Sequence, residues 1–127
     1  MKKTFCTQVG PKALGPYSTA ASDGNTVYLS GMLGLVPADG KLAQGGVEAE
    51  AAQAIANIKA VLEEMGLSMA NILKTTIFLT DIADFGKVNA LYADAFGPDY
   101  PARSCFQVAA LPAGAHVEIE CIAACEL

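Results

Sequence analysis

The spacing of apolar residues along the chain predicts two amphipathic helices. Over residues 47–65, apolar side chains recur three or four positions apart, as in a helix that buries one face. Gly66 follows at the position where helices often end in the left-handed conformation. A second stripe over residues 81–96 predicts another helix, with Asp81 or Asp84 as its N-cap. The stripes consist of Val47, Ala51, Ile55, Ile58, Leu62 and Met65 in the first helix, and of Phe85, Val88, Leu91, Tyr92 and Phe96 in the second.

Short segments rich in β-branched and aromatic residues predict the strands. The first two are joined by Asp23-Gly24-Asn25, a sequence that suits a hairpin turn. The predicted strands are residues 17–21, 26–31, 72–80, 103–109 and 116–125. Together with the helices, the order is β-β-α-β-α-β-β. This order favours an α+β domain in which two helices cover one face of a mixed sheet.

The length of the chain and its low charge add two expectations. At 127 residues, the chain is expected to form a single domain over residues 1–127. Two helices leave the other face of the sheet uncovered, and charged residues make up only 17% of the chain against 53% hydrophobic residues. Both observations indicate that part of the surface is hidden against further copies of the chain.

The distribution of charge and of apolar residues excludes several classes of function. The net charge is −5 and no basic stripe is present, which argues against nucleic-acid binding as the function. No apolar run approaches the length of a membrane span, and no apolar segment of a secretory signal follows the N-terminal lysines. We therefore expect a cytoplasmic protein without a membrane partner.

The cysteines and the histidine do not suggest a metal site. No two of the four cysteines form a CxxC pair, and His116 is the only histidine. The cysteines are Cys6, Cys105, Cys121 and Cys125. Cys121 and Cys125 are interpreted as small buried thiols in a reducing compartment, whereas the role of Cys105 stays open. Phosphate-binding, dinucleotide-binding and nucleophile-elbow motifs are missing from the sequence.

Polar residues on the last two predicted strands are the candidates for chemistry. Strand alternation places Arg103, Cys105 and Gln107 on one face of their strand. Glu118 and Glu120 share the side of the last strand that is not core. Because the chain between these strands is short, Arg103 is expected to lie within reach of Glu118 or Glu120.

Two interpretations of this cluster compete. In the first, Arg103 and a glutamate form an ion pair on the sheet surface or at a subunit interface. In the second, the guanidinium binds a ligand carboxylate while a glutamate handles a proton or a water. A cation would also lower the pKa of the Cys105 thiol, but no histidine stands in a position to act as its base. The residues alone leave the choice open.

Six segments of the chain resemble the RidA/YjgF family of enamine/imine deaminases. They are GPYS (15–18), YLSG (28–31), KTTIFLTDIADF (74–85), VNALY (88–92), PARSC (101–105) and VEIECIA (117–123). The resemblance spans nearly the whole chain, in order. It implies a chorismate-mutase-like fold that assembles as a homotrimer with three clefts between subunits. The implied reaction hydrolyses 2-enamines and 2-imines, such as 2-aminoacrylate and 2-iminopropionate, to 2-keto acids and ammonia without a cofactor. Such clearance protects the enzymes that release these reactive species.

The resemblance also implies roles for individual residues. Arg103 would hold the substrate carboxylate, and Glu118 would activate water. Cys105 would lie close to the substrate and contribute its backbone N–H more than its sulfur. Gly31 would contribute its backbone, where a side chain would block close approach. The remaining positions that would line the cleft are Tyr17, Ser30 and Asn89. Asn89 is equally open to a purely structural hydrogen bond.

One departure from the family pattern and two rival functions remain. The family commonly has Gln after Ser30-Gly31, whereas this chain has Met32, which either faces the cleft and alters substrate range or packs in the core. A trimer that binds small carboxylates at Arg103 without turnover would share every feature except the need for Glu118. The ribonuclease description of some relatives is disfavoured by the acidic charge and by the lack of a His/Lys acid–base pair.

Overall fold

The computed structural model describes residues 1–125 of the chain. Its strands are β1 (Lys3–Phe5), β2 (Ala20–Ser22), β3 (Thr26–Leu33), β4 (Leu35–Val36), β5 (Lys41–Leu42), β6 (Ile72–Leu79), β7 (Ala102–Gln107) and β8 (Val117–Ala124). Its helices are α1 (Gly46–Glu64) and α2 (Phe85–Phe96), with short 3₁₀ turns at Met69–Asn71, Ile82–Asp84 and Pro112–Gly114. Residues 126 and 127, which the predicted domain also includes, lie outside the described residues.

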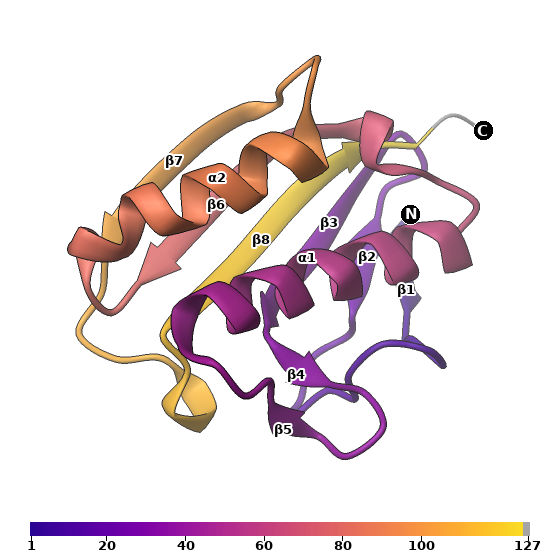
Figure 1. The fold of residues 1–127 in the computed structure, drawn as a ribbon. Helices are drawn as coiled ribbons and strands as arrows, with labels where there is room; N and C mark the ends of the chain where they lie inside the picture. Colours follow the sequence, from indigo (N-terminus) through magenta and orange to yellow (C-terminus); the bar gives the residue numbers. More distant parts are fainter. Residues whose placement is uncertain (126–127) are drawn as a thin grey trace.

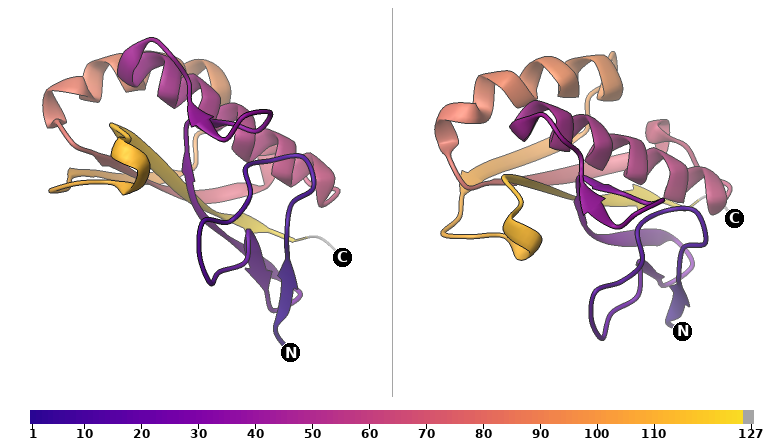
Figure 2. Two further views of the ribbon diagram at one scale, coloured as in Figure 1. Left: turned by 90° about the horizontal axis from the view of Figure 1, so that it is seen from below. Right: turned by 60° about the horizontal axis from the view of Figure 1, so that its bottom comes forward.

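Six strands form one mixed sheet in the order β1-β2-β3-β8-β6-β7 (Figure 1). All pairs are antiparallel except β6 and β7, which α2 connects as a parallel crossover. Both helices lie on the same face of this sheet, and the other face has no helix over it (Figure 2). The predicted α+β class, with two helices on one face of a mixed sheet, is confirmed.

The bounds of several elements differ from the prediction. The segment 17–21 is mostly loop, and β2 begins only at Ala20. Residues 81–84 form a 3₁₀ turn capped by the Asp81 side chain, so α2 begins at Phe85. Strand β1 and the β4–β5 hairpin were not predicted, because two or three residues carry too little periodicity. The hairpin turn between β2 and β3 and the end of α1 at Gly66, whose φ is 79°, follow the prediction.

The core lies between the helices and the sheet. Alternate residues of β6 and β8 face α1 and α2, as in Ile77, Leu79 and Ile119, which are almost fully buried. Burial of one such side chain stabilises the fold by about 1.5–3 kcal/mol. Within the core, the Asn57 amide of α1 donates to the carbonyl oxygens of Leu33 (3.2 Å) and Leu35 (2.9 Å). This buried amide therefore fixes α1 against the junction of β3 and β4.

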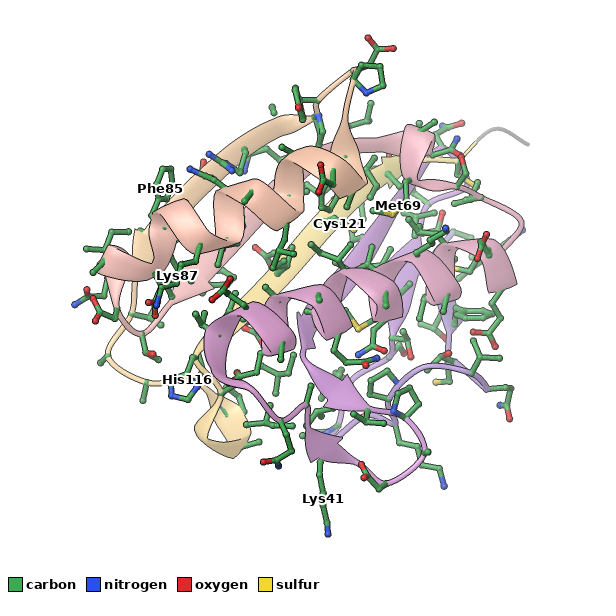
Figure 3. The ribbon with its side chains drawn as sticks, viewed as in Figure 1. Lys41, Met69, Phe85, Lys87, His116 and Cys121 are labelled. Atoms are coloured by element: carbon green, nitrogen blue, oxygen red, sulfur yellow. The ribbon has the colours of Figure 1, made fainter. Side chains whose placement is uncertain are left out.

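Close approach of α1 to that junction requires a glycine. A Cβ atom on Gly34 would lie 2.3 Å from the backbone oxygen of Glu50, so no side chain fits there. The Glu50 carboxylate, 2% exposed, accepts from the backbone N–H of His116 (2.8 Å) and pairs with its ring Nδ1 (2.6 Å). Figure 3 shows His116 beside the start of α1, just before β8. The pair thus ties the N-terminal part of α1 to the residue that precedes β8.

The His116–Glu50 pair predicts a stability change with pH. The hydrogen bond and the charge of Glu50 raise the pKa of His116, with a smaller contribution from Asp84, so the folded-state pKa exceeds the unfolded value of about 6.5. The stabilisation is present below that value and is lost as pH rises through the folded pKa. As pH rises from about 6 to about 9, we expect the thermal midpoint of wild type to decrease more than that of His116→Gln. Parallel curves for the two proteins would contradict this expectation.

Among the described residues, no helix is long and apolar enough to cross a membrane.

The uncovered sheet face carries large apolar side chains that solvent reaches. Tyr28 and Phe106 are both exposed, and Phe106 meets Phe78 edge to face with ring centroids 5.2 Å apart. Glu118 and Glu120 point to this same face, because they alternate with the buried residues of β8.

Candidate active site

Arg103 and Glu118 lie on opposite faces of the sheet. Strand β6 separates β7 from β8, and the register pairs Arg103 with the buried Thr75 under α2. Glu118 instead pairs with Phe78 on the uncovered face. The expectation that Arg103 reaches Glu118 or Glu120 within one chain is therefore wrong. The physical reason is strand order: the loop between β7 and β8 passes over one strand, which alternation along a strand cannot reveal.

The Arg103 side chain is held against α2. Its Nη1 donates to Asn89 Oδ1 at 2.7 Å, and its Cζ lies 4.8 Å from the ring centroid of Tyr92 and 5.2 Å from that of Phe85. Phe85 is labelled in Figure 3 at the first turn of α2. The guanidinium is exposed in a hollow that Tyr100 also lines. It carries five N–H donors, and its fork remains available for a planar anion such as a carboxylate.

Glu118 lines a separate cavity of about 360 Å³. Its carboxyl is half-buried, and burial raises its pKa, with a further contribution from the negative charge of Glu120. Such a carboxyl gains and loses a proton closer to neutral pH than an exposed glutamate does. Tyr17, Ser30 and Gly31 line the same cavity, so the structure brings four of the predicted site residues together.

Gly31 lies directly against the Glu118 carboxyl. A Cβ atom at Gly31 would lie 2.6 Å from Glu118 Cδ, so a side chain at this position would displace the carboxyl. The pairing of β3 with β8 shifts register between Leu29 and Met32, where three steps on β3 face two steps on β8. A β-bulge therefore occurs at this point, as is frequent beside active sites.

The two other predicted members of this group make local hydrogen bonds. Ser30 donates through its hydroxyl to the Ser18 carbonyl (2.7 Å) and through its backbone N–H to the Thr19 carbonyl (2.9 Å). The Tyr17 hydroxyl accepts from the Leu14 backbone N–H at 3.1 Å and is otherwise open to the cavity. Ser30 thus fixes the loop before β2, while Tyr17 presents a phenol that can contact a ligand.

Cys105 lies two residues after Arg103 on β7 and is half-buried against the core. Burial raises the pKa of its thiol, and the nearby Arg103 charge opposes this shift without reversing it. The side chain is therefore a neutral thiol near pH 7, which disfavours a thiolate nucleophile. Of the two cysteines predicted to be buried, Cys121 is buried, with its pKa raised to about 12, whereas Cys125 is only partly covered.

A neutral Cys105 thiol predicts tolerance to its removal. For the imine hydrolysis that the family resemblance implies, we expect Cys105→Ala to retain most of the wild-type activity, because its backbone N–H remains and a neutral thiol is a poor nucleophile. Steady-state turnover of both proteins checks this expectation, together with the rate at which iodoacetamide alkylates Cys105 in the wild type. Loss of activity comparable to that of a catalytic-base variant would indicate instead that the sulfur reacts.

Met32, the departure from the family pattern, packs in the core. Its side chain is 5% exposed and its register partner on β8 is the buried Ile119. The methionine is therefore a packing residue, although it also borders the cavity that Glu118 lines.

The sequence analysis missed Tyr92, which it assigned only to the apolar stripe of the second helix. Its spacing of three from Asn89 places both on one side of α2, a signal that could have linked it to Arg103.

In the described part of the chain, no group of three or more His, Cys, Asp or Glu side chains could hold a metal ion. The fold and its polar groups define a protein with two separate polar hollows, one with a guanidinium fork and one with a carboxyl of raised pKa. The model of the family described as endoribonuclease L-PSP matches residues 7–125, and the chain belongs to this family.

Similar proteins of known name span almost the full length of the chain. The 2-iminobutanoate/2-iminopropanoate deaminase of Bos taurus is 47% identical over 97% of this chain and 90% of its own. RidA from the Antarctic bacterium Psychrobacter sp. PAMC 21119 is 43% identical, with a TM-score of 0.92 over 96% of this chain and 98% of its own. E. coli TdcF, solved with bound serine, is 38% identical, with a TM-score of 0.89 over 96% and 98%. The resemblance to RidA proteins is thereby confirmed.

Proposed function

We propose that the protein hydrolyses 2-imino acids and their 2-enamine tautomers to 2-keto acids and ammonia. The observation that carries the proposal is the Glu118 carboxyl of raised pKa at the wall of a cavity, in a chain that also presents the Arg103 fork. The deaminase name of a relative 47% identical to this chain supports the same reaction. The substrates 2-aminoacrylate, 2-iminopropanoate and 2-iminobutanoate are small planar carboxylates that match the fork in shape and charge.

Each residue has a chemical role in this proposal. Arg103 holds the substrate carboxylate, and Glu118 accepts a proton from water as the water oxygen attacks the carbon of the protonated imine. The neutral carbinolamine that forms takes this proton from Glu118 on its nitrogen. The C–N bond then breaks while the hydroxyl group gives its proton to Glu118, so ammonia leaves, the carbonyl of the 2-keto acid forms, and Glu118 releases the proton to solvent. General acid–base help of this kind contributes about 10²–10⁴-fold. The imine carbon is already electrophilic, so the reaction requires no electron sink.

The positions of Arg103 and Glu118 support a site shared between subunits. They lie on opposite faces of one sheet, so a single substrate can contact both only if they come from different copies of the chain. The uncovered face that carries Glu118 also exposes Tyr28 and Phe106, a surface suited to a second copy. We therefore propose that the active form is an oligomer with its clefts between neighbouring subunits, and the resemblance to the RidA/YjgF family implies that this oligomer is a homotrimer.

Mixing two inactive variants tests the shared site. At substrate concentrations well below KM, Arg103→Ala and Glu118→Ala chains are each expected to show very little activity alone, whereas a refolded mixture restores clefts that combine an intact Arg103 with an intact Glu118. An equal mixture of trimers then recovers about a quarter of the wild-type activity. A mixture as inactive as its components would place both residues in one chain's site and overturn the arrangement.

Turnover itself is measured with an imine generated in place. A pyridoxal-phosphate-dependent lyase acting on serine releases 2-aminoacrylate, and semicarbazide traps the imine that the protein has not cleared. Faster clearance with wild type than without protein supports the deaminase. Pyruvate binding without any acceleration would support the rival function, a trimer that binds small carboxylates.

The description of the family as endoribonucleases adds one arm to the assay. Labelled RNA incubated with wild type and Glu118→Ala is expected to stay intact, because a chain of net charge −5 offers phosphate little attraction.

For the place of action we propose the cytoplasm, where the free thiols of Cys6, Cys105, Cys121 and Cys125 remain reduced.

A further inference from the structure

Tyr92 occupies an unusual place between the core and the exposed guanidinium. Its side chain is 4% exposed, yet its ring centroid lies 4.8 Å from Cζ of Arg103. Phe96 stacks on the same ring with centroids 4.1 Å apart. A guanidinium over an aromatic ring is attracted by the negative face of the ring, and the attraction increases when water is excluded from one side.

The hydroxyl of Tyr92 is anchored deeper in the protein. It lies 2.6 Å from Thr75 Oγ1, and Thr75 is 0% exposed on β6. Burial raises the pKa of the Tyr92 hydroxyl, so the group remains protonated and can donate this bond. Within residues 1–125, neither hydroxyl makes another hydrogen bond, so the two depend on each other, since a buried hydroxyl without a partner is costly.

Thr75 also stands directly beside Arg103 across the β6–β7 ladder. The three residues therefore form a closed arrangement: Thr75 and Arg103 are backbone partners, and the Tyr92 side chain joins Thr75 at one end and Arg103 at the other. Packing of α2 required only an apolar ring at position 92, and a phenylalanine would have met that need. The phenol and its threonine partner add a fixed orientation of the ring.

We propose that Tyr92 is a positioning residue for Arg103: its ring supports the guanidinium, and its bond to Thr75 fixes the ring. A free arginine side chain loses much rotamer entropy when it binds an anion. Support from Tyr92, together with the Asn89 bond, removes part of that loss before the ligand arrives. The inference rests on the proposed function only in naming a carboxylate as the ligand of Arg103.

The test compares four variants by pyruvate binding, turnover and thermal midpoint. Tyr92→Leu removes the ring, and we expect the dissociation constant of pyruvate and KM to rise by about 3- to 30-fold with little change in kcat. Tyr92→Phe and Thr75→Val each remove the bond and are expected to weaken pyruvate binding by about 2- to 10-fold. The control, Val88→Ala, opens a cavity in the same helix without touching Arg103, and lowers the thermal midpoint alone.

A double variant separates positioning from general destabilisation. Because Tyr92→Phe and Thr75→Val remove the same bond, the double variant is expected to bind pyruvate no more weakly than either single one. Unchanged pyruvate affinity in Tyr92→Phe and Thr75→Val would overturn the proposal, even if Tyr92→Leu fails to fold. Failure of wild type to turn over imine while it binds pyruvate would overturn the proposed deaminase and leave the positioning of Arg103 standing.

Discussion

Replacing Arg103 with alanine is expected to lower kcat/KM for 2-iminopropanoate by at least about 100-fold, mainly through KM. The physical reason is the loss of the proposed two-pronged, charge-assisted contact to the substrate carboxylate. Among residues 1–125, no second cation lines the hollow beside α2 and could replace it. Arg103→Lys keeps the charge without the fork, and we expect it to recover only part of the loss. Steady-state kinetics and pyruvate titration of the three proteins check this result.

A charge control accompanies the Arg103 variants. Lys87 also lies on α2, is exposed, and forms only a loose pair with Asp84, with 3.8 Å between Nζ and Oδ1. Lys87→Ala therefore changes the net charge by the same amount with no expected effect on KM. An equal rise of KM in both variants would show that long-range attraction of the anion, and not a direct contact, explains the effect of Arg103.

Replacing Glu118 with glutamine is expected to lower kcat by about 10²–10⁴-fold while KM changes little. The amide fills the same volume and cannot accept a proton from water. Because burial and the charge of Glu120 raise the pKa of Glu118, the wild-type rate should increase as pH rises through this raised pKa. The same limb of the pH–rate profile should be missing from Glu118→Gln, and its persistence would assign the base to another group.

Gly31 offers an independent test of the Glu118 position. In Gly31→Ala the new Cβ would lie 2.6 Å from Glu118 Cδ, so the carboxyl must move, and we expect kcat to fall as in Glu118→Gln. Gly86→Ala is the matched control, since a Cβ there meets nothing within 4 Å and the residue is helical. Full activity in Gly31→Ala would mean that Glu118 works from more than one position.

Local patterns predicted which residues share a face of each element. Alternation correctly placed Arg103 with Cys105 on one face of β7, and Glu118 with Glu120 away from the core on β8. These predictions succeed because the side-chain period of a strand is a local property of the backbone. For the same reason, helical spacing located α1 and α2 within a few residues.

The relation between strands could not be predicted in the same way. The short connection between β7 and β8 suggested neighbouring strands, but β6 pairs with both and separates them. Strand order depends on which long-range pairing buries the most apolar surface, and no window of the sequence contains that information. The candidate residues consequently appeared as one cluster in the sequence and as two separate groups in the structure.

The sequence by itself determined the α+β class, the faces of each element and the family, and it named the residues proposed to carry the chemistry, because each of these follows from periodicity or from local motifs. Tertiary structure decided where those residues meet. It placed Arg103 on Tyr92 and Asn89 under α2, set Glu118 against Gly31 at a bulge, and put the two groups on opposite faces of one sheet. The reason is physical: contacts between residues distant in the chain form only when competing packings of the whole core have been resolved.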